Sequence, residues 1–157
     1  MWQTHDSCRR RECSSRGLWE VVIVVDTNVI VAAYKEDSDC HQVCKRLLTT
    51  STPLATTAYV FAEVDYLLTK YGGPEVTLAA LRDIASFVML APVGSSTLHV
   101  AFQVMEKHPE IGLTDASLVA LAGDCGTTQL ATMDYRHFRA ISPLSGGKYF
   151  TLVPEDG

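Results

Sequence analysis

The sequence predicts a three-layer α/β domain with a mainly parallel central sheet, and three observations favour this fold class. The chain has 157 residues, of which 47% are hydrophobic and 20% are charged, which suits one domain with one buried core. The run Val21–Val25 consists of β-branched residues without polar alternation, which is typical of a strand buried on both faces of a parallel sheet. Helical and strand patterns then alternate along the chain, as they do in βαβ units.

After the first strand, the helical spacing of apolar residues beyond Ser38, a cap candidate, predicts a helix over about 39–50. A short strand is expected at Pro53–Thr56. The next segment, Ala58–Tyr71, has a helical pattern that Gly72-Gly73 closes.

The second half continues the alternation. Pro74 suits the first position of a helix that runs to about Phe87. Ser95 or Ser96 can cap a helix that ends at Lys107, before Pro109. The remaining elements are expected to be a strand at Val88–Val93, a helix at Asp115–Ala122 capped by Thr114 and ended by Gly123 with Gly126, and strands at Gln129–Met133 and Tyr149–Val153.

Residues 1–18 are polar, rich in Arg, Ser and Cys, and without periodicity, so we expect a disordered tail there and one domain over residues 19–157. The cysteines are odd in number and scattered, and the first residues include no apolar segment of the kind that signal peptides contain. These features predict a cytoplasmic protein in a reducing compartment. No uncharged apolar run approaches the roughly 20 residues of a membrane span, so we expect no membrane partner.

The domain is acidic, since residues 21–157 contain nine Lys and Arg against fifteen Asp and Glu. A passive nucleic-acid binder neutralises phosphates with basic side chains, so this balance argues against one. If the protein handles nucleic acid, metal ions or a local basic strip must supply the positive charge.

Four acidic residues stand where the predicted fold brings distant segments together. Asp26 and Asp134 each follow a predicted strand, and the carboxyl ends of parallel strands meet at the edge of the sheet where such folds bind ligands. We interpret Glu63 as an interruption of a core-facing helical stripe, because its neighbours three and four residues away are apolar or aromatic. Asp115 opens a helix and shares a face with apolar residues.

Each of these residues has an ordinary structural explanation when it is considered alone. Asp26 can cap the following helix, Glu63 can pair with a buried Lys or Arg, and Asp115 suits the helix dipole. Four carboxylates within a few ångströms would repel one another and raise their pKa values, so together they require a cation. An all-oxygen set without flanking His or Cys matches Mg²⁺ or Mn²⁺ rather than zinc, and such an ion can activate water for phosphodiester hydrolysis.

Four segments carry these carboxylates: Val24-Val25-Asp26-Thr27-Asn28-Val29-Ile30, Ala62-Glu63-Val64, Leu113 through Ala122, and Leu130 through Phe138. In their order and spacing they resemble the motifs of PIN-domain ribonucleases, and more narrowly those of the toxins of VapBC toxin–antitoxin modules. The resemblance covers about residues 21–154, and the Arg- and Cys-rich tail before it has no counterpart in the family pattern.

The resemblance implies a PIN-like fold and an endoribonuclease that depends on Mg²⁺ or Mn²⁺. Its acidic quartet maps onto Asp26, Glu63, Asp115 and Asp134, and its supporting hydrogen-bonding residues map onto Asn28 and Thr132. We expect Asp26, Asp115 and Asp134 to hold the metal, directly or through its waters, and Glu63 to complete the shell or orient the attacking water. The resemblance also implies an RNA substrate such as tRNA, a homodimer, and a cognate antitoxin whose Arg or Lys enters the acidic pocket.

The segment after Asp134 has two interpretations. Arg136, His137 and Arg139 can form a basic strip that holds RNA phosphates beside the site. Alternatively, the segment is a solvated turn that Phe138 anchors in the core.

Other functions fit the residues less well. Cys40 and Cys44 lie one helical turn apart, but their spacing matches no zinc-finger pattern, and core packing is the better explanation. A phosphoaspartyl phosphatase needs an aspartate two residues after the first one, where this chain has Asn28. A dinucleotide-binding domain needs a Gly-rich turn after the first strand, which is missing here. A receiver-like domain phosphorylated on Asp26 is a weaker alternative, and a PIN-like domain that binds RNA or protein without cutting is the serious one.

Overall fold

The computed structural model describes residues 22–156. The strands are β1 (Ile23–Val25), β2 (Leu54–Thr57), β3 (Val88–Ala91), β4 (Gln129–Ala131) and β5 (Thr151–Val153). The helices are α1 (Thr27–Tyr34), α2 (His41–Leu48), α3 (Ala58–Phe87), α4 (Ser95–Lys107), α5 (Leu113–Cys125) and α6 (Tyr135–Arg139). The tail expected at residues 1–18, including Cys8 and Cys13, lies outside the described residues.

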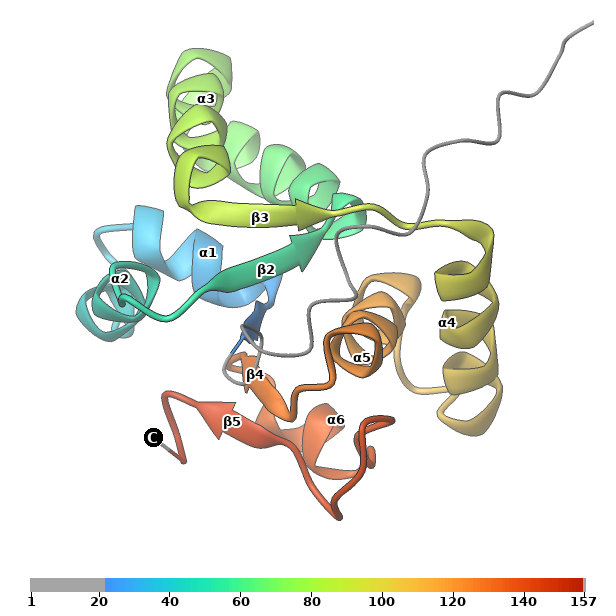
Figure 1. The fold of residues 1–157 in the computed structure, drawn as a ribbon. Helices are drawn as coiled ribbons and strands as arrows, with labels where there is room; N and C mark the ends of the chain where they lie inside the picture. Colours follow the sequence, from blue (N-terminus) through green and yellow to red (C-terminus); the bar gives the residue numbers. More distant parts are fainter. Residues whose placement is uncertain (1–21, 157) are drawn as a thin grey trace, which may run out of the picture.

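The strands form one sheet in the order β3-β2-β1-β4-β5, and every neighbouring pair is parallel (Figure 1). Helix α1 packs against α2 and α3, while α4 packs against α5, which covers β1 and β2. The predicted three-layer α/β fold with a parallel sheet is therefore confirmed. No helix within residues 22–156 has both the length and the apolar character needed to cross a membrane.

Strand β1 lies in the middle of the sheet, with β2 on one side and β4 on the other. The four residues Val22 to Val25 are all buried, as expected for a strand that helices cover on both faces. The parallel arrangement places the carboxyl ends of β1 and β4 side by side, because Val25 pairs with Ala131. The residues that directly follow β1 and β4 therefore lie close together at one edge of the sheet.

Helix α3 contains the predicted break between two helical segments. Gly73 has a positive φ of 80°, which a residue with a side chain rarely adopts, and Pro74 follows it. The chain changes direction there, so α3 is two helices joined at a kink, as the Gly-Gly-Pro sequence predicts.

The predicted helix caps were partly wrong. Gly94 and Gly112 are the N-caps of α4 and α5, in extended conformations and without side-chain cap hydrogen bonds, so Ser95, Ser96 and Thr114 do not have this role. Cys40 is the N-cap of α2, and the Ser38 hydroxyl instead accepts a hydrogen bond from the Cys40 backbone. In each case the residue with the best capping chemistry lies one or two positions from the cap that the tertiary fold selects.

The boundaries of the later elements also differ from the prediction. Gly123 lies inside α5 rather than at its end, and a Cβ at this position would come within 3.0 Å of the Leu144 side chain. The helix ends at Gly126, which has a left-handed conformation. The third and fourth strands end earlier than predicted, because apolar residues such as Met133 continue past the last paired residues, and the fifth strand begins later, at Thr151.

Candidate active site

Asp26 occupies the junction between β1 and α1. It is the N-cap of α1, and its Oδ1 accepts a hydrogen bond of 2.6 Å from the backbone N–H of Thr27. The structural explanation of Asp26 as a helix cap is thus correct. It is incomplete, because the other carboxylate oxygen faces β4.

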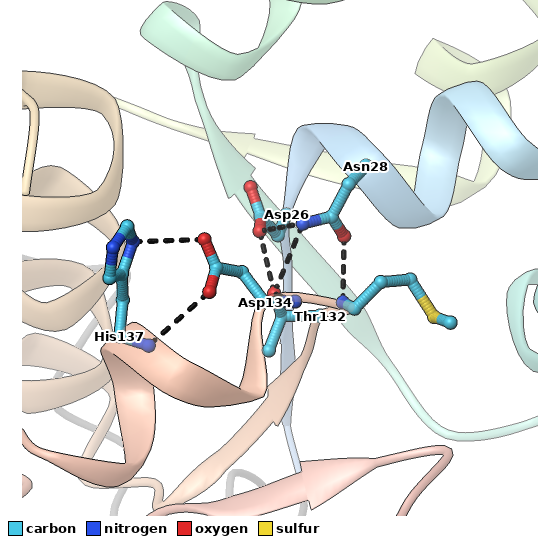
Figure 2. A network of polar contacts seen from close by, with 6 residues as sticks. Asp26, Asn28, Thr132, Asp134 and His137 are labelled. Atoms are coloured by element: carbon cyan, nitrogen blue, oxygen red, sulfur yellow. Dashed lines mark hydrogen bonds and ion pairs between the residues drawn. The ribbon is translucent and has the colours of Figure 1, made fainter.

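That second oxygen belongs to a polar network that joins β1 to the segment after β4 (Figure 2). Oδ2 of Asp26 accepts hydrogen bonds of 2.7 Å from Asn28 Nδ2 and from Thr132 Oγ1. Thr132 Oγ1 in turn accepts from the backbone N–H of Asp134, at 2.9 Å, and Asn28 Oδ1 accepts from the backbone N–H of Met133, also at 2.9 Å. Asn28 and Thr132 therefore make the supporting hydrogen bonds expected of them.

Burial gives Asp26 unusual acid–base behaviour. The side chain is 4% exposed, and this burial is the main reason that its pKa is raised from 3.8 to about 7. The negative charges of Asp115 and Glu63 raise the pKa further, while the hydrogen bonds from Thr132 and Thr27 lower it. Ionisation of Asp26 is therefore costly at neutral pH, although three hydrogen-bond donors contact its carboxylate, and two other acids lie close enough to raise its pKa.

Asp115 lies in the first turn of α5 and faces the same region. Its pKa is raised, first by burial and then by the charges of Asp134 and Glu63, whereas His137 lowers it. Asp115 and Asp26 thus each respond to two other members of the predicted quartet. The four carboxylates come from four separate segments and form one electrostatically coupled group.

Glu63 corrects one prediction. It is exposed rather than core-facing, because the buried positions of this part of α3 are Val60, Val64 and Leu68, and Glu63 lies beside that stripe. Its Oε2 accepts a hydrogen bond of 2.8 Å from Thr27 Oγ1. Within residues 22–156 it has no ion pair with Lys or Arg, so the alternative explanation of a buried salt bridge is wrong.

Asp134 is the N-cap of the short helix α6. Its Oδ1 accepts a hydrogen bond of 3.2 Å from the backbone N–H of His137, and the His137 ring nitrogen Nδ1 lies 2.9 Å from its Oδ2. The sequence analysis predicted neither α6 nor this contact. It expected no His beside the carboxylates, and the position of His137 shows that this expectation was wrong. The D-x-x-H spacing was the available signal, since the third residue of a helix can reach back to its cap.

The structure supports a part of each interpretation of the segment after Asp134. Phe138 is fully buried and anchors α6 in the core. Arg136 is exposed and has no ion pair among the residues that the structure describes, whereas Arg139 pairs with Asp156 near the end of the chain. One of the two arginines therefore already has an acidic partner.

The cysteines of α2 are part of the core rather than a metal site. Cys44 is fully buried, and its Sγ lies 4.0 Å from the Met133 sulfur. Burial, with a contribution from Cys40, raises the pKa of the Cys44 thiol to about 11, which disfavours the thiolate that zinc requires.

The chemistry of the carboxylates fits a hard divalent cation, although their present conformations do not enclose one. No three His, Cys, Asp or Glu side chains of residues 22–156 are arranged so that they could hold a metal ion as they lie. Asp26, Glu63 and Asp134 instead each accept hydrogen bonds from the protein. Burial first, and then the charges of neighbouring carboxylates, raise the pKa values of Asp26 and Asp115, and a bound cation would favour the ionised form of both.

Two cavities lie away from these residues. One, of about 310 Å³, lies between the end of α1 and α3 and includes Tyr34 and Tyr71 in its lining. The other, of about 360 Å³, lies between α4, α5 and the segment after α6, and includes Lys107 and Leu144. Neither contains a member of the carboxylate group.

Comparison with known proteins gives consistent results. The family model of the PIN domain matches residues 23–142. The chain is 32% identical over 136 residues to Ribonuclease VapC26 of Mycobacterium tuberculosis, an alignment that covers 84% of this chain and all of that protein.

Solved structures share the fold. VapC20 of Mycobacterium tuberculosis, described as a sarcin–ricin loop cleaving toxin, superposes with a TM-score of 0.68 at 23% identity, over 75% of this chain and 94% of that one. A toxin–antitoxin complex from Klebsiella pneumoniae gives a TM-score of 0.61 at 19% identity, over 77% and 93% of the two chains. VapBC2 from Rickettsia felis, bound to a promoter DNA fragment, gives 0.61 at 20% identity, over 78% and 95%.

Proposed function

This chain belongs to the PIN-domain family, and from that premise we propose that it is an endoribonuclease that hydrolyses RNA phosphodiester bonds with the help of Mg²⁺ or Mn²⁺. The observation that carries the proposal is the coupling of Asp26, Glu63, Asp115 and Asp134 at one edge of the sheet, in a chain that is similar along most of its length to a named ribonuclease.

In this proposal Asp26, Asp115 and Asp134 hold the cation, directly or through its waters, and Glu63 completes the shell or orients the attacking water. When bound, the cation supplies an activated water and neutralises charge on the transferred phosphate. Asn28 and Thr132 fix the Asp26 carboxylate by hydrogen bonds to Oδ2. Thr27 orients Glu63 in the same way, through a hydroxyl that donates to Oε2.

We further propose that the protein is the toxin of a type II toxin–antitoxin pair. The similarity to VapC26 and to the folds of toxin–antitoxin complexes supports this assignment. The acidic site would attract an Arg or Lys side chain of a cognate antitoxin, which competes with the cation for the same carboxylates. We also propose that the protein forms a homodimer and that its substrate is a structured RNA such as tRNA.

The test is cleavage of total cellular RNA by the purified protein with Mg²⁺, with Mn²⁺ and with EDTA. An Asp115→Asn variant is the matched control, since Asp115 is only half-buried and the substitution preserves its shape. We expect discrete products that require the metal and disappear with the variant. Cleavage that survives the substitution would contradict the assigned site, and a folded, cation-binding protein that cuts nothing would favour binding without cleavage.

A further inference from the structure

His137 contacts the carboxylate group, and the proposed function leaves its side chain without a role. Its ring nitrogen Nδ1 is buried, while about a third of the side chain as a whole is exposed. The Asp134 carboxylate lies at ion-pair distance from Nδ1, and no hydrogen-bond partner with good geometry satisfies this nitrogen among the described residues. A buried polar atom that lacks a well-aligned partner is uncommon, and here it faces an active-site acid.

The contacts of His137 account for the position of Asp134. The backbone N–H of His137 binds one carboxylate oxygen and the ring nitrogen Nδ1 lies 2.9 Å from the other, so the same residue contacts both oxygens of Asp134 (Figure 2). Each carboxylate oxygen has two lone-pair sites, so these contacts leave one site on each oxygen for a further ligand. Asp134 can therefore keep its contacts with His137 while it binds a cation.

His137 also acts on a second member of the group. Its charge lowers the pKa of Asp115, whose neighbours Asp134 and Glu63 raise it. The ring is thus close enough to influence both Asp115 and Asp134. On the Asp26 side, neutral donors, Asn28 and Thr132, hold the carboxylate instead.

We propose that His137 is a positioning residue, whose Nδ1–H holds the Asp134 carboxylate toward Asp115 so that both acids can bind one divalent cation. This inference rests on the proposed function and deepens it. Ligand carboxylates in metal sites are commonly held by such outer hydrogen bonds, and loss of one costs about 10- to 100-fold in metal affinity or activity.

The experiment uses three substitutions that differ only in where a donor remains. In His137→Asn the side-chain amide nitrogen takes the place of Nδ1, in His137→Gln it takes the place of Nε2, and His137→Leu has no donor. We expect the Mn²⁺ dissociation constant, measured by calorimetry, to rise about 10- to 100-fold in the Gln and Leu variants and to stay close to that of the unchanged protein in the Asn variant. The turnover of RNA should follow the same order.

Two outcomes would overturn the inference. If all three variants bind Mn²⁺ like the unchanged protein, His137 does not position a ligand. If the Gln variant keeps affinity and the Asn variant loses it, the ring acts through Nε2 and not through Asp134.

A measurement without metal separates this inference from the proposed function. Nitrogen NMR of the metal-free protein at alkaline pH reports which ring nitrogen carries the proton. We expect the Nδ1–H form, and we expect Asp134→Ala to abolish that preference, whereas an Nε2–H form in the unchanged protein contradicts the inference. If the unchanged protein shows the Nδ1–H form but neither binds Mn²⁺ nor cuts RNA, the proposed function fails and the His137 contact stands.

Discussion

The two ends of the carboxylate group hold the same chemical group in different environments. Asp26 is 4% exposed and receives hydrogen bonds from three residues of two segments, and its pKa is raised to about 7. The Asp134 side chain is 39% exposed, and His137, three residues further along, provides its side-chain contacts. We infer that ionisation of Asp26 affects the stability of the domain, whereas Asp134 is accessible to solvent and substrate.

The largest expected effect is on cleavage, where the two ends should behave alike. We expect Asp26→Asn and Asp134→Asn each to reduce RNA cleavage roughly 100-fold or more, because each removes a charged ligand of the proposed cation. Both variants should remain folded by circular dichroism. A variant that retains activity would remove that end of the group from the site.

Stabilisation by the cation is the next effect, and it also involves both ends. At a hundredfold excess of Mg²⁺ or Mn²⁺ over its dissociation constant, the free energy of unfolding should rise by about 2.7 kcal/mol. Thermal or denaturant unfolding measures this, with Asp37→Asn as a control that removes an exposed acid beyond the opposite end of α1 from Asp26. Equal stabilisation of the Asp26→Asn variant would show that the cation binds elsewhere.

The pH dependence of stability should separate the two ends. The pKa of Asp26 is about 7 in the folded protein and near 3.8 when unfolded, so the folded state binds the proton more tightly. Its contribution to stability is complete below about pH 4 and is lost as the pH rises through 7. Between pH 5 and pH 8 we expect the metal-free protein to lose about 2–3 kcal/mol of unfolding free energy. Asp26→Asn should lose most of this dependence and become the more stable protein at pH 8, whereas Asp134→Asn should retain it.

The sequence allows the Asp26 end to be predicted better than the Asp134 end, for physical reasons. Five β-branched residues before Asp26 define a buried strand, and the strand-end rule then places its carboxylate. Helix α6 has five residues, which is too few for a periodic pattern, so periodicity could not predict the helix, and only the D-x-x-H spacing indicated the contact of His137 with Asp134.

Glu63 shows the limit of periodicity in a different way. Its neighbours Tyr59, Val60, Tyr66 and Leu67 suggest a buried face, yet Tyr66 is 65% exposed and the buried stripe is rotated toward Val64. An aromatic residue on the surface shifted the predicted face of the helix by about one position. Only tertiary packing determines which of two adjacent stripes is covered.

Thr132 joins the two ends and offers a smaller, more specific test. It is fully buried, donates to Asp26, and accepts from the backbone of Asp134 and from Asn28. Thr132→Val keeps the shape, but it removes the acceptor of the Asp134 backbone N–H and one of the two donors to Asp26 Oδ2, so we expect a loss of about 1–3 kcal/mol of stability in urea unfolding. Thr132→Ser keeps the hydroxyl and should lose less. If the Ser variant is the less stable of the two, the methyl group matters more than the network.

The smallest effect concerns the exposed end alone, where two arginines follow Asp134. Arg139 already pairs with Asp156, while Arg136 has no such partner among residues 22–156, so only Arg136 has its full charge available for an RNA phosphate. We expect Arg136→Gln to lower the salt dependence of RNA binding by about one phosphate contact, and Arg139→Gln to lower it by less.

Fluorescence titrations at several salt concentrations, in EDTA to prevent cleavage, measure the salt dependence of RNA binding. Lys148→Gln is the control for loss of a positive charge outside this segment. An effect of Arg139→Gln as large as that of Arg136→Gln would mean that RNA displaces Asp156, and the exposed end would then extend to the last residues of the chain.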